Sequence, residues 1–265
     1  MKTKALETSA AERVIYYSAF TDDVVESADQ NILLPENYEW IKKSPVQKFL
    51  YHFLYILVLP AAVLFCRINL HARFYGKEKI KKAGKKGFVV YANHTQMVGD
   101  AFIPSWIFAP HHTNTVISPA NYGIPVLGKI LDYLGGLPVP QKLSQFPDFN
   151  SAVAKRLKEG RCVIVYPEAH VWPYFTGIRP FTSVSFSYAV DNDVPVYSMT
   201  STYYKRKHGE KPGMKIYIDG PFFADKNQTK KQQRQELCDK VTEQLKERSK
   251  LSSYSYIQYV KKENV

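Results

Sequence analysis

The sequence predicts an α/β fold: a mixed, largely parallel sheet flanked by helices, preceded by an N-terminal membrane-associating helical segment. Two short apolar runs, residues 88–92 and 161–166, have the composition of strands that are covered on both faces of a parallel sheet. A segment with apolar residues at helical spacing lies between them, as a parallel crossover requires. Ahead of the sheet, residues 49–66 form 18 positions without a charged side chain.

Charge is distributed unevenly along the 265 residues. Residues 1–39 contain eight acidic and three basic side chains, whereas the whole chain carries a net charge of +12. A basic chain of this size favours anionic partners, such as phospholipid headgroups, nucleotides or nucleic acid. Nucleic acid is disfavoured because the basic residues flank an apolar segment and do not alternate with aromatic residues on a strand.

Domain organisation follows from these contrasts. We expect an acidic N-terminal extension over residues 1–48, an apolar membrane-associating segment over 49–70 and an α/β domain over 71–265. The three cysteines have no metal-like spacing, which indicates a reduced, intracellular protein. No apolar run follows the first lysines, so we expect no secretory signal.

The N-terminal extension contains a helix-like piece over residues 10–20 and then an acidic turn. Whether the extension docks onto the domain or forms a loose surface segment is open at this point.

Residues 49–66 reach the lower limit for a membrane span. His52 and Pro60 interrupt the run, and Tyr51 and Tyr55 are of a type that membrane interfaces favour. Three structures are compatible: a helix pair that dips into or lies on one leaflet, a true span, or a buried core helix. Residues 67–86 then carry eight basic side chains against the single acid Glu78. This run is either a solvated linker or a surface that attracts anionic lipid, at about 1 kcal/mol per basic residue.

The remaining elements follow in order. We expect a strand at 113–118, a short helix at 125–134 that stops at two glycines, and a short edge strand at 137–139. A helix should begin after Asp148 as its N-cap and end before Gly160. Strands at 194–204 and 214–219 and a C-terminal amphipathic helix at 229–250 complete the sheet and its cover.

Polar residues follow both buried strands. Asn93 and His94 end the first, and Glu168 and His170 follow the second. Because parallel strands end at the same edge, which is where α/β sheets bind ligands, we expect both groups to open onto one site. His94 is either a loop-capping residue or, with Asp100 holding its tautomer, a general base for a hydroxyl group.

Several common sites are excluded by missing motifs. No G-x-S-x-G elbow, P-loop or G-x-G-x-x-G fingerprint is present. A metal site built from His94, Asp100, Glu168 and His170 has suitable ligand types, but the spacings match no metal signature. We therefore expect no metal and no bound cofactor.

The order of four blocks resembles the glycerolipid acyltransferases, typified by 1-acyl-glycerol-3-phosphate acyltransferase. The resemblance covers residues 70–220, and the blocks are Asn93-His94 with a following Asp, residues 123–128 leading to 134–139, Val165-Tyr166-Pro167-Glu168, and Val194-Pro195-Val196. It implies a membrane-associated O-acyltransferase of phospholipid biosynthesis at the cytoplasmic face of the cell membrane. An acyl thioester, either acyl-CoA or acyl carrier protein, would be the donor and co-substrate, and a lysophospholipid the acceptor.

The resemblance also implies residue roles. His94 would be the general base and Asp100 would orient its imidazole, while Asn93, Glu168 and His170 would belong to the acceptor-binding region. Two departures from the family pattern bear on these roles. Five residues separate His94 from Asp100 where the family has four, so either Gly99 absorbs the extra residue as a bulge or turn, or Asp100 lies out of reach of His94 and the dyad is weakened or lost.

The second departure concerns phosphate binding. The family's G-T-R after Pro-Glu is replaced by Ala169-His170-Val171, so its arginine is missing. Lys142 or Arg179 is expected to substitute for it. Two other functions stay open: a catalytically inactive lipid-binding relative and a metal-assisted lipid hydrolase.

Overall fold

The computed structural model describes residues 13–25, 32–42, 44–84, 86–125 and 128–262. At its centre is a seven-stranded sheet with the order β2-β8-β7-β3-β6-β4-β5. These strands are β2 (Arg73–Tyr75), β3 (Phe88–Ala92), β4 (Thr113–Ile117), β5 (Gly136–Pro138), β6 (Cys162–Val165), β7 (Val196–Tyr204) and β8 (Gly213–Phe222). Every neighbouring pair is parallel except β7 and β8. The predicted mixed, largely parallel sheet is therefore confirmed.

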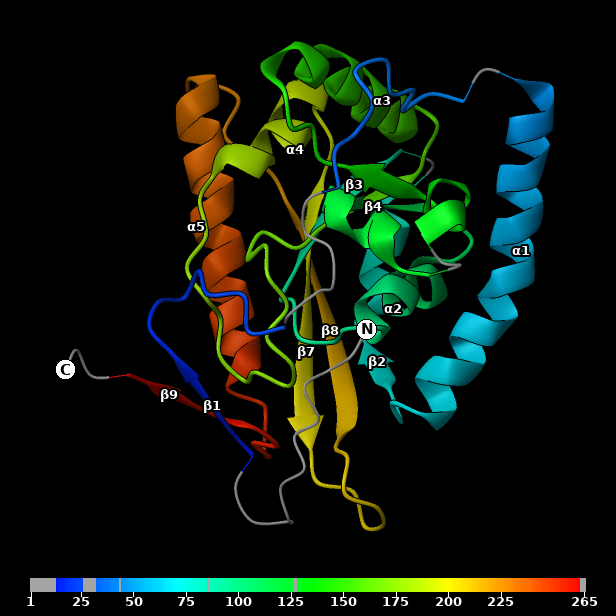
Figure 1. Cartoon of the computed structure of the whole chain (residues 1–265). Helices are drawn as coiled ribbons and strands as arrows, with labels where there is room; N and C mark the ends of the chain where they lie inside the picture. The colour runs from blue at the N-terminus through cyan, green and yellow to red at the C-terminus, as the bar shows by residue number, and fades with distance from the viewer. Residues whose placement is uncertain (1–12, 26–31, 43, 85, 126–127, 263–265) are drawn as a thin grey trace.

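Helices flank the sheet, with α1 and α5 at opposite sides of the molecule (Figure 1). The α-helices are α1 (Pro45–Ile68), α2 (Gly99–Phe108), α3 (Phe146–Lys158), α4 (Ser187–Asn192) and α5 (Lys230–Ser249). α5 begins with a capping box in which Thr229 and Gln232 satisfy each other's backbone groups.

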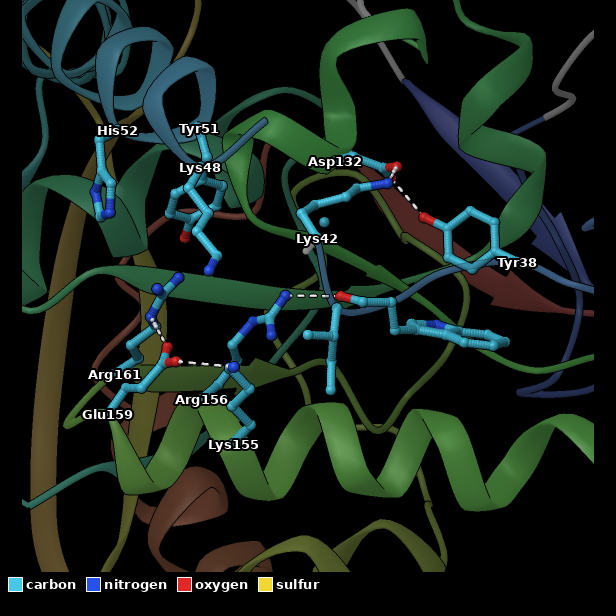
Figure 2. A pocket seen from close by; sticks show the side chains of 13 residues that line it. Tyr38, Lys42, Lys48, Tyr51, His52, Asp132, Lys155, Arg156, Glu159 and Arg161 are labelled. Atoms are coloured by element: carbon cyan, nitrogen blue, oxygen red, sulfur yellow. Dashed lines mark hydrogen bonds and ion pairs between the residues drawn. The ribbon is translucent and has the colours of Figure 1, made fainter. Parts of the chain in front are cut away.

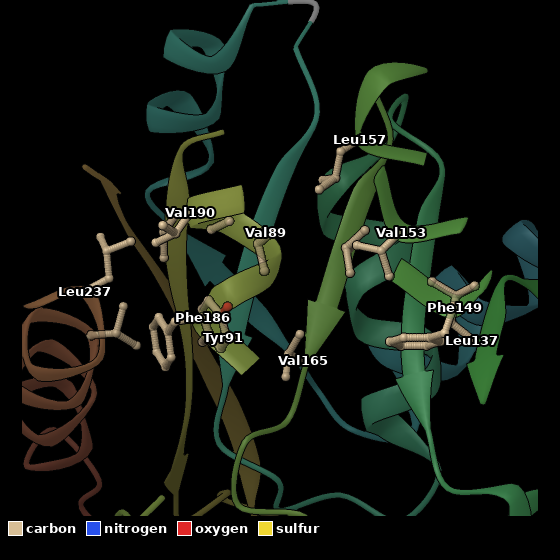
Figure 3. Close-up of a cluster of buried hydrophobic side chains, with 14 of the residues drawn as sticks. Val89, Tyr91, Leu137, Phe149, Val153, Leu157, Val165, Phe186, Val190 and Leu237 are labelled. Carbon is tan, nitrogen blue, oxygen red and sulfur yellow. The ribbon is translucent and has the colours of Figure 1, made fainter. Parts of the chain in front are cut away.

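The sheet is buried on both faces because the central strands are apolar at every position. All five residues of β3 and all four of β6 are buried. On one face Val89, Tyr91 and Val163 pack in a cluster with side chains of α3, α4 and α5 (Figure 3). On the other, Val90 and Ile164 pack with side chains of α2 and with Cys66 of α1. Successive residues of a strand point to opposite faces, so both core clusters anchor β3.

α1 is one continuous helix of 24 residues that includes Pro60, and it is not a helix pair. It is long and apolar enough to cross a membrane, since an 18-residue window within it has a mean hydropathy of 2.2. Four of its side chains are buried: Tyr51, Tyr55, Ala62 and Cys66. Seven large apolar side chains are exposed: Val46, Phe49, Phe53, Ile56, Leu57, Leu64 and Ile68. α1 is therefore only partly a core helix, because it also presents an apolar surface that the described residues leave uncovered.

Other predicted boundaries differ from the structure. Gly128–Leu134 forms a 3-10 helix, and residues 126–127 of the predicted helix at 125–134 lie outside the described residues. α3 begins at Phe146, with Gln145 at the N-cap position, so Asp148 is a first-turn residue and not the N-cap. In the first turn its carboxylate still complements the helix dipole.

The helix predicted at 10–20 is wrong over its described part. Residues Val14–Tyr17 form β1, which pairs in parallel with β9 (Gln258–Lys261) at the far end of the chain. A four-residue strand of this kind is stabilised by a partner that local sequence does not reveal.

Residues 32–42 dock onto the sheet domain. Trp40 is buried, and its indole N–H donates to the carbonyl of Pro138 at 2.9 Å. The carbonyl of Trp40 in turn accepts from the Arg156 guanidinium at 2.8 Å. Of the two alternatives for the N-terminal extension, this part is docked.

Trp40→Ala tests whether the extension is part of the folded unit. Removing a buried aromatic side chain should lower the free energy of unfolding by about 3–5 kcal/mol. Urea denaturation followed by circular dichroism measures this, with Leu33→Ala as the matched control because Leu33 is 75% exposed. A loss below about 0.5 kcal/mol for Trp40→Ala, as expected for a surface position, would contradict the docked extension.

Candidate active site

The site forms where β3 and β6 end. These strands are adjacent and parallel, so His94 and Glu168, which follow them, lie at the same edge of the sheet. A direct contact joins the two, because the backbone N–H of His94 donates to Glu168 Oε2 at 3.1 Å. The predicted meeting of the two polar groups is what the structure shows.

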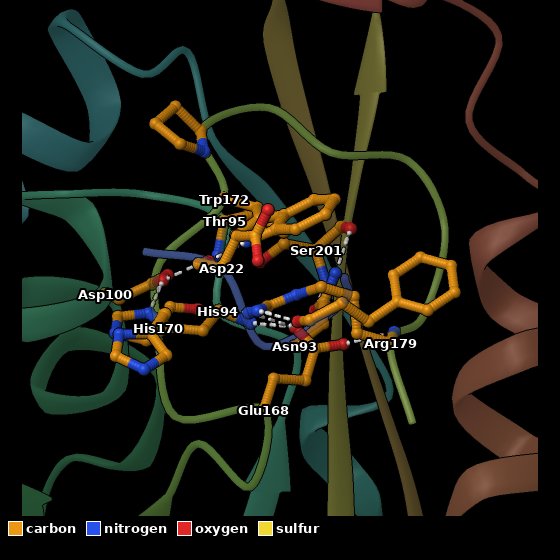
Figure 4. Close-up of polar contacts among 12 residues, drawn as sticks. Asp22, Asn93, His94, Thr95, Asp100, Glu168, His170, Trp172, Arg179 and Ser201 are labelled. Atoms are coloured by element: carbon orange, nitrogen blue, oxygen red, sulfur yellow. Dashed lines mark hydrogen bonds and ion pairs between the residues drawn. The ribbon is translucent and has the colours of Figure 1, made fainter. Parts of the chain in front are cut away.

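His94 and Asp100 form a dyad. His94 Nδ1 lies 2.7 Å from Asp100 Oδ2, and this same carboxylate oxygen accepts the backbone N–H groups of Thr95 and Gln96, each at 2.9 Å (Figure 4). Asp100 is buried, with 3% of its surface exposed. Because this oxygen faces Nδ1 as an acceptor, it favours the tautomer in which Nδ1 carries the proton.

This arrangement leaves His94 Nε2 as the basic nitrogen. Among the described residues Nε2 has no hydrogen-bond partner, and 22% of the His94 side chain is exposed. A neutral imidazole with Nδ1 protonated offers a lone pair at Nε2 to an incoming hydroxyl group.

The extra residue between His94 and Asp100 is not absorbed at Gly99. Gly99 is the first residue of α2 and has no positive φ. The length is taken up by residues 93–96, which form no regular secondary structure, and by a turn at 97–98, after which the first turn of α2 carries Asp100 back to the imidazole. The expectation of a bulge at Gly99 was wrong, because helix initiation closes the loop. Gly99 instead allows close packing, because an added Cβ at this position would lie 2.8 Å from a methyl group of Leu70, which is too close without a shift.

Tyr166, the residue after β6, supports the dyad from the other strand. Its ring stacks on the His94 imidazole with a centroid separation of 4.5 Å and an interplanar angle of 25°. Its hydroxyl donates to the backbone carbonyl of Asp100 at 2.7 Å. Burial, together with the nearby Asp100 carboxylate, raises the pKa of Tyr166 well above its ordinary value, so the hydroxyl stays protonated and remains a donor.

Glu168 and Arg179 form a buried ion pair. Arg179 donates to Glu168 through its backbone N–H at 2.9 Å and through Nη2 at 3.2 Å. The two side chains are 0–1% exposed. Burial raises the pKa of Glu168, although the Arg179 charge and the N–H groups of Arg179 and His94 oppose this shift.

Arg179 places a positive charge beside Glu168 near the end of β6, where the family's motif arginine is missing from this sequence. Its guanidinium also donates to the backbone carbonyls of His170 and Phe20, and it lies 4.9 Å from the ring of Trp172. In this structure it is enclosed by protein groups. Arg179 and Glu168 therefore hold the loop that carries them, and their expected contact with substrate would need this enclosure to open.

The N-terminal segment covers this part of the site. The Trp172 indole donates to the carbonyl of Asp22 at 2.9 Å, and the His170 ring lies 3.4 Å from the Asp23 carboxylate. His170 is thus directed at the acidic segment.

Asn93 and Lys142 both contact other protein groups. Asn93 is 1% exposed and ties β3 to β7, since its amide exchanges hydrogen bonds with both backbone groups of Ser201 at 2.8 and 3.0 Å. Lys142 follows β5 at the edge of the sheet and pairs with Glu36. Of the proposed cation substitutes, only Arg179 reaches Glu168.

Ala169 shows why a glycine suits its position in the family motif. Its φ is 64°, in the left-handed region that costs a side-chain-bearing residue about 1–2 kcal/mol. The tight turn after Glu168 is nevertheless kept, with the N–H of His170 donating to the carbonyl of Glu168 at 2.9 Å.

Three contributors were missed by sequence reasoning: Tyr166, Trp172 and the segment around Phe20–Asp23. Tyr166 was visible as a polar-tipped aromatic at a strand end, beside the residue already chosen. Trp172 and the segment could not be found, because their contacts span about 150 positions of sequence.

A metal centre is not formed by the described residues: no three His, Cys, Asp or Glu side chains among them are placed to hold an ion. Asp100 and Glu168 already accept hydrogen bonds from protein donors.

Glu168→Gln tests the structural role of the buried pair. Leaving the Arg179 charge buried without its partner should lower the free energy of unfolding by about 3–5 kcal/mol, measured by urea denaturation. The double variant Glu168→Gln/Arg179→Met should be more stable than Glu168→Gln alone, because no charge is then stranded.

The matched control is Lys226→Met, which breaks an ion pair whose side chains are both 74% exposed and should cost at most about 1 kcal/mol. The pair does not hold the loop if Glu168→Gln lowers the free energy of unfolding no more than this control does. The same conclusion follows if the double variant loses as much stability as the single variants Glu168→Gln and Arg179→Met lose together.

Comparison with known proteins agrees with this geometry. Residues 71–202 match the family model described as Acyltransferase. Among solved structures, the fold is similar to the 1-acyl-sn-glycerophosphate (LPA) acyltransferase PlsC from Thermotoga maritima, at 16% identity and a TM-score of 0.53 over 79% of this chain and 97% of that chain. No curated protein sequence matches. The dyad, the Glu168 strand end and most of the sheet fall within the matched range, and residues 71–202 form a domain of the acyltransferase family.

Proposed function

We propose that this protein is a membrane-associated O-acyltransferase that moves a fatty acyl group from an acyl thioester to the hydroxyl of a lysophospholipid. The observation that carries the proposal is the 2.7 Å contact between His94 and the buried Asp100 at the end of β3. The similarity to an LPA acyltransferase supports 1-acyl-glycerol-3-phosphate as the type of acceptor.

The proposed reaction begins with proton transfer to His94. Nε2 takes the proton of the acceptor hydroxyl as its oxygen attacks the thioester carbonyl carbon. The C–S bond of the resulting tetrahedral intermediate then breaks, and the thiolate leaves with the proton from the imidazolium. The ionised Asp100 stabilises this imidazolium, and the ring does not need to turn between the two steps.

The surrounding residues serve the same proton transfer by restricting the ring. Tyr166 stacks on one face of the imidazole, and Glu168 holds the backbone N–H of His94. A general base placed in this way contributes about 10²- to 10⁴-fold in rate, and the rest must come from positioning of the two substrates and stabilisation of the oxyanion.

Membrane association is proposed from α1 and the basic run after it. The exposed apolar residues of α1 would insert into the headgroup and acyl boundary of one leaflet, while its buried side holds the domain. Residues 67–86, with their eight basic side chains, would add attraction to anionic lipid. Three free, buried cysteines agree with a reducing compartment, so we place the protein at the cytoplasmic face of the cell membrane.

The donor is proposed as acyl-CoA or acyl carrier protein, since either presents the thioester that this chemistry needs. The acceptor headgroup has to be identified by assaying a panel of lysophospholipids, because the family's phosphate-binding arginine is replaced in this sequence and Arg179 is enclosed by protein groups.

His94→Ala should abolish acyl transfer. With purified protein, acyl-CoA or acyl carrier protein and a panel of lysophospholipids, release of free thiol should fall at least about 100-fold because the general base is lost. His208→Ala is the matched control, since it removes an exposed histidine of the loop after β7 and should leave the rate unchanged.

Thiol release that survives His94→Ala would refute the mechanism. If the wild-type protein turns over no lysophospholipid and yet binds vesicles, it is an inactive lipid-binding relative. Ester hydrolysis that a chelator abolishes would instead support a metal-assisted hydrolase.

The exposed face of α1 can be tested by Phe49→Ser/Phe53→Ser/Ile56→Ser. Each such apolar side chain contributes about 1.5–3 kcal/mol when removed from water, so vesicle binding in a flotation assay should fall by more than 100-fold. Leu143→Ser/Val184→Ser is the control, because these side chains are 89% and 75% exposed away from α1. Unchanged binding of the triple variant would place the attachment elsewhere, in the basic domain.

A further inference from the structure

A second polar site lies at the N-terminal ends of the parallel strands, opposite to the strand ends that carry His94. A cavity of about 250 Å³ opens where β5 and β6 begin, between the end of α3 and the first turns of α1 (Figure 2). The catalytic dyad lies where the parallel strands end, so the length of the strands separates the two places.

The lining of this cavity is strongly basic. Five cationic side chains line it: Lys42, Lys48, Lys155, Arg156 and Arg161. Only two carboxylates do so, and both are already engaged. Asp132 pairs with Lys42 at 2.7 Å, and Glu159 pairs with Arg161 at 2.8 Å and with Lys155 at 3.8 Å.

Two cations in the cavity therefore have no carboxylate partner within the part of the chain that the structure describes. These are Lys48, on the first turn of α1, and Arg156, on the last turn of α3. They approach the cavity from different helices, so a ligand between them would bridge α1 and α3.

Arg156 is the more informative of the two because it is buried. Only 8% of its surface is exposed. One guanidinium nitrogen donates to the carbonyl of Trp40 at 2.8 Å, while Nε is buried without a hydrogen-bond partner. Burial lowers the pKa of Arg156, and the positive charge of Arg161 lowers it further. A buried guanidinium without a carboxylate partner is costly, and an anion in the cavity would supply the opposite charge.

From this arrangement we infer that the cavity binds a phosphate group, through Arg156 and Lys48 with Arg161 at its rim. The planar guanidinium fork matches phosphate oxygens in pairs, and a lysine adds a point charge. Arg161 is held in place by Tyr51, whose ring centroid lies 4.9 Å from the guanidinium carbon. Three positive charges in excess of the carboxylates suit a phosphate mono- or dianion better than a single carboxylate.

The phosphate could belong to a lipid headgroup or be free in solution, and the position of the cavity favours the lipid. Lys48, Tyr51 and His52 line the cavity from the same turns of α1 that expose Phe49 and Phe53. If this helix lies in the leaflet as proposed above, the cavity stands at the level of the headgroups, where basic pockets beside membrane helices bind anionic lipid. Only the lipid source depends on that proposal, and phosphate binding does not.

The test compares Lys48→Gln/Arg156→Gln with Lys158→Gln/Lys231→Gln. The control pair removes the same two positive charges from exposed positions outside the cavity. Inorganic phosphate should raise the thermal unfolding midpoint of the wild-type protein above its value in chloride of equal ionic strength. The cavity variant should weaken phosphate binding at least tenfold, and the control should bind as the wild type does.

A second arm uses vesicle flotation on phosphatidylcholine with and without phosphatidic acid. If the phosphate is that of a lipid, the cavity variant should bind the anionic vesicles about 25-fold more weakly, at about fivefold per cation, and phosphatidylcholine vesicles unchanged. Phosphate binding without this vesicle effect would assign the site to a soluble phosphate.

Because Arg156→Gln alters a buried position, Lys48→Gln/Lys155→Gln serves as a second variant confined to exposed side chains. It should weaken phosphate binding in the same direction while unfolding at the wild-type temperature in chloride. The inference is overturned if phosphate does not stabilise the wild-type protein beyond chloride, or if the cavity and control variants lose binding equally. Neither result bears on His94 or on acyl transfer.

Discussion

The parallel pairing of β3 with β6 is the constraint on which the proposed site depends. Both strands are apolar at every position, so they are stable only at the centre of a sheet that is covered on both faces. This burial fixes their register, with Phe88 opposite Cys162 and Tyr91 opposite Val165. The residues that follow, His94 on one strand and Tyr166 and Glu168 on the other, are consequently brought into contact, and the imidazole is held by both strands.

Much of this could be predicted from the sequence because it follows from local patterns. The buried runs at 88–92 and 161–166 predicted central strands, and parallel crossovers then required His94 and Glu168 to share an edge. Asp100 could be chosen as the partner of His94 because the two are close in sequence. Arg179 could be suggested as a substitute cation, but its position could not be predicted. Only the structure shows that the loop after Glu168 folds back and brings Arg179 into contact with this carboxylate.

The parts that sequence did not reveal depend on distant partners or on helix initiation. β1 was mistaken for a helix because its pairing partner, β9, lies at the other end of the chain. Lys142 was considered for the acceptor site, but the strand order puts it beyond the edge strand β5. Gly99 was expected to form a bulge, whereas the start of α2 solves the spacing and Gly99 serves close packing against Leu70.

The two edges of the sheet give the protein two chemically different places. One carries a buried carboxylate that orients a partly exposed imidazole, and the other a basic cavity whose buried arginine has no carboxylate partner among the described residues. α1 runs alongside the domain and presents an apolar face that the described residues leave uncovered, and this face would carry the proposed membrane association. Proton transfer at the first edge is the central claim, because acyl transfer requires it.

Asp100→Asn tests that claim most directly. An amide oxygen at position 100 can still accept the N–H groups of Thr95, Gln96 and His94 Nδ1, but it carries no negative charge, so the imidazolium formed during the reaction loses the charge that stabilises it. In a single-turnover measurement of labelled acyl transfer from the thioester to the lysophospholipid, we expect a loss of at least about 100-fold with the unfolding midpoint nearly unchanged. A rate equal to that of the wild type would contradict the account of His94 as a base oriented by Asp100.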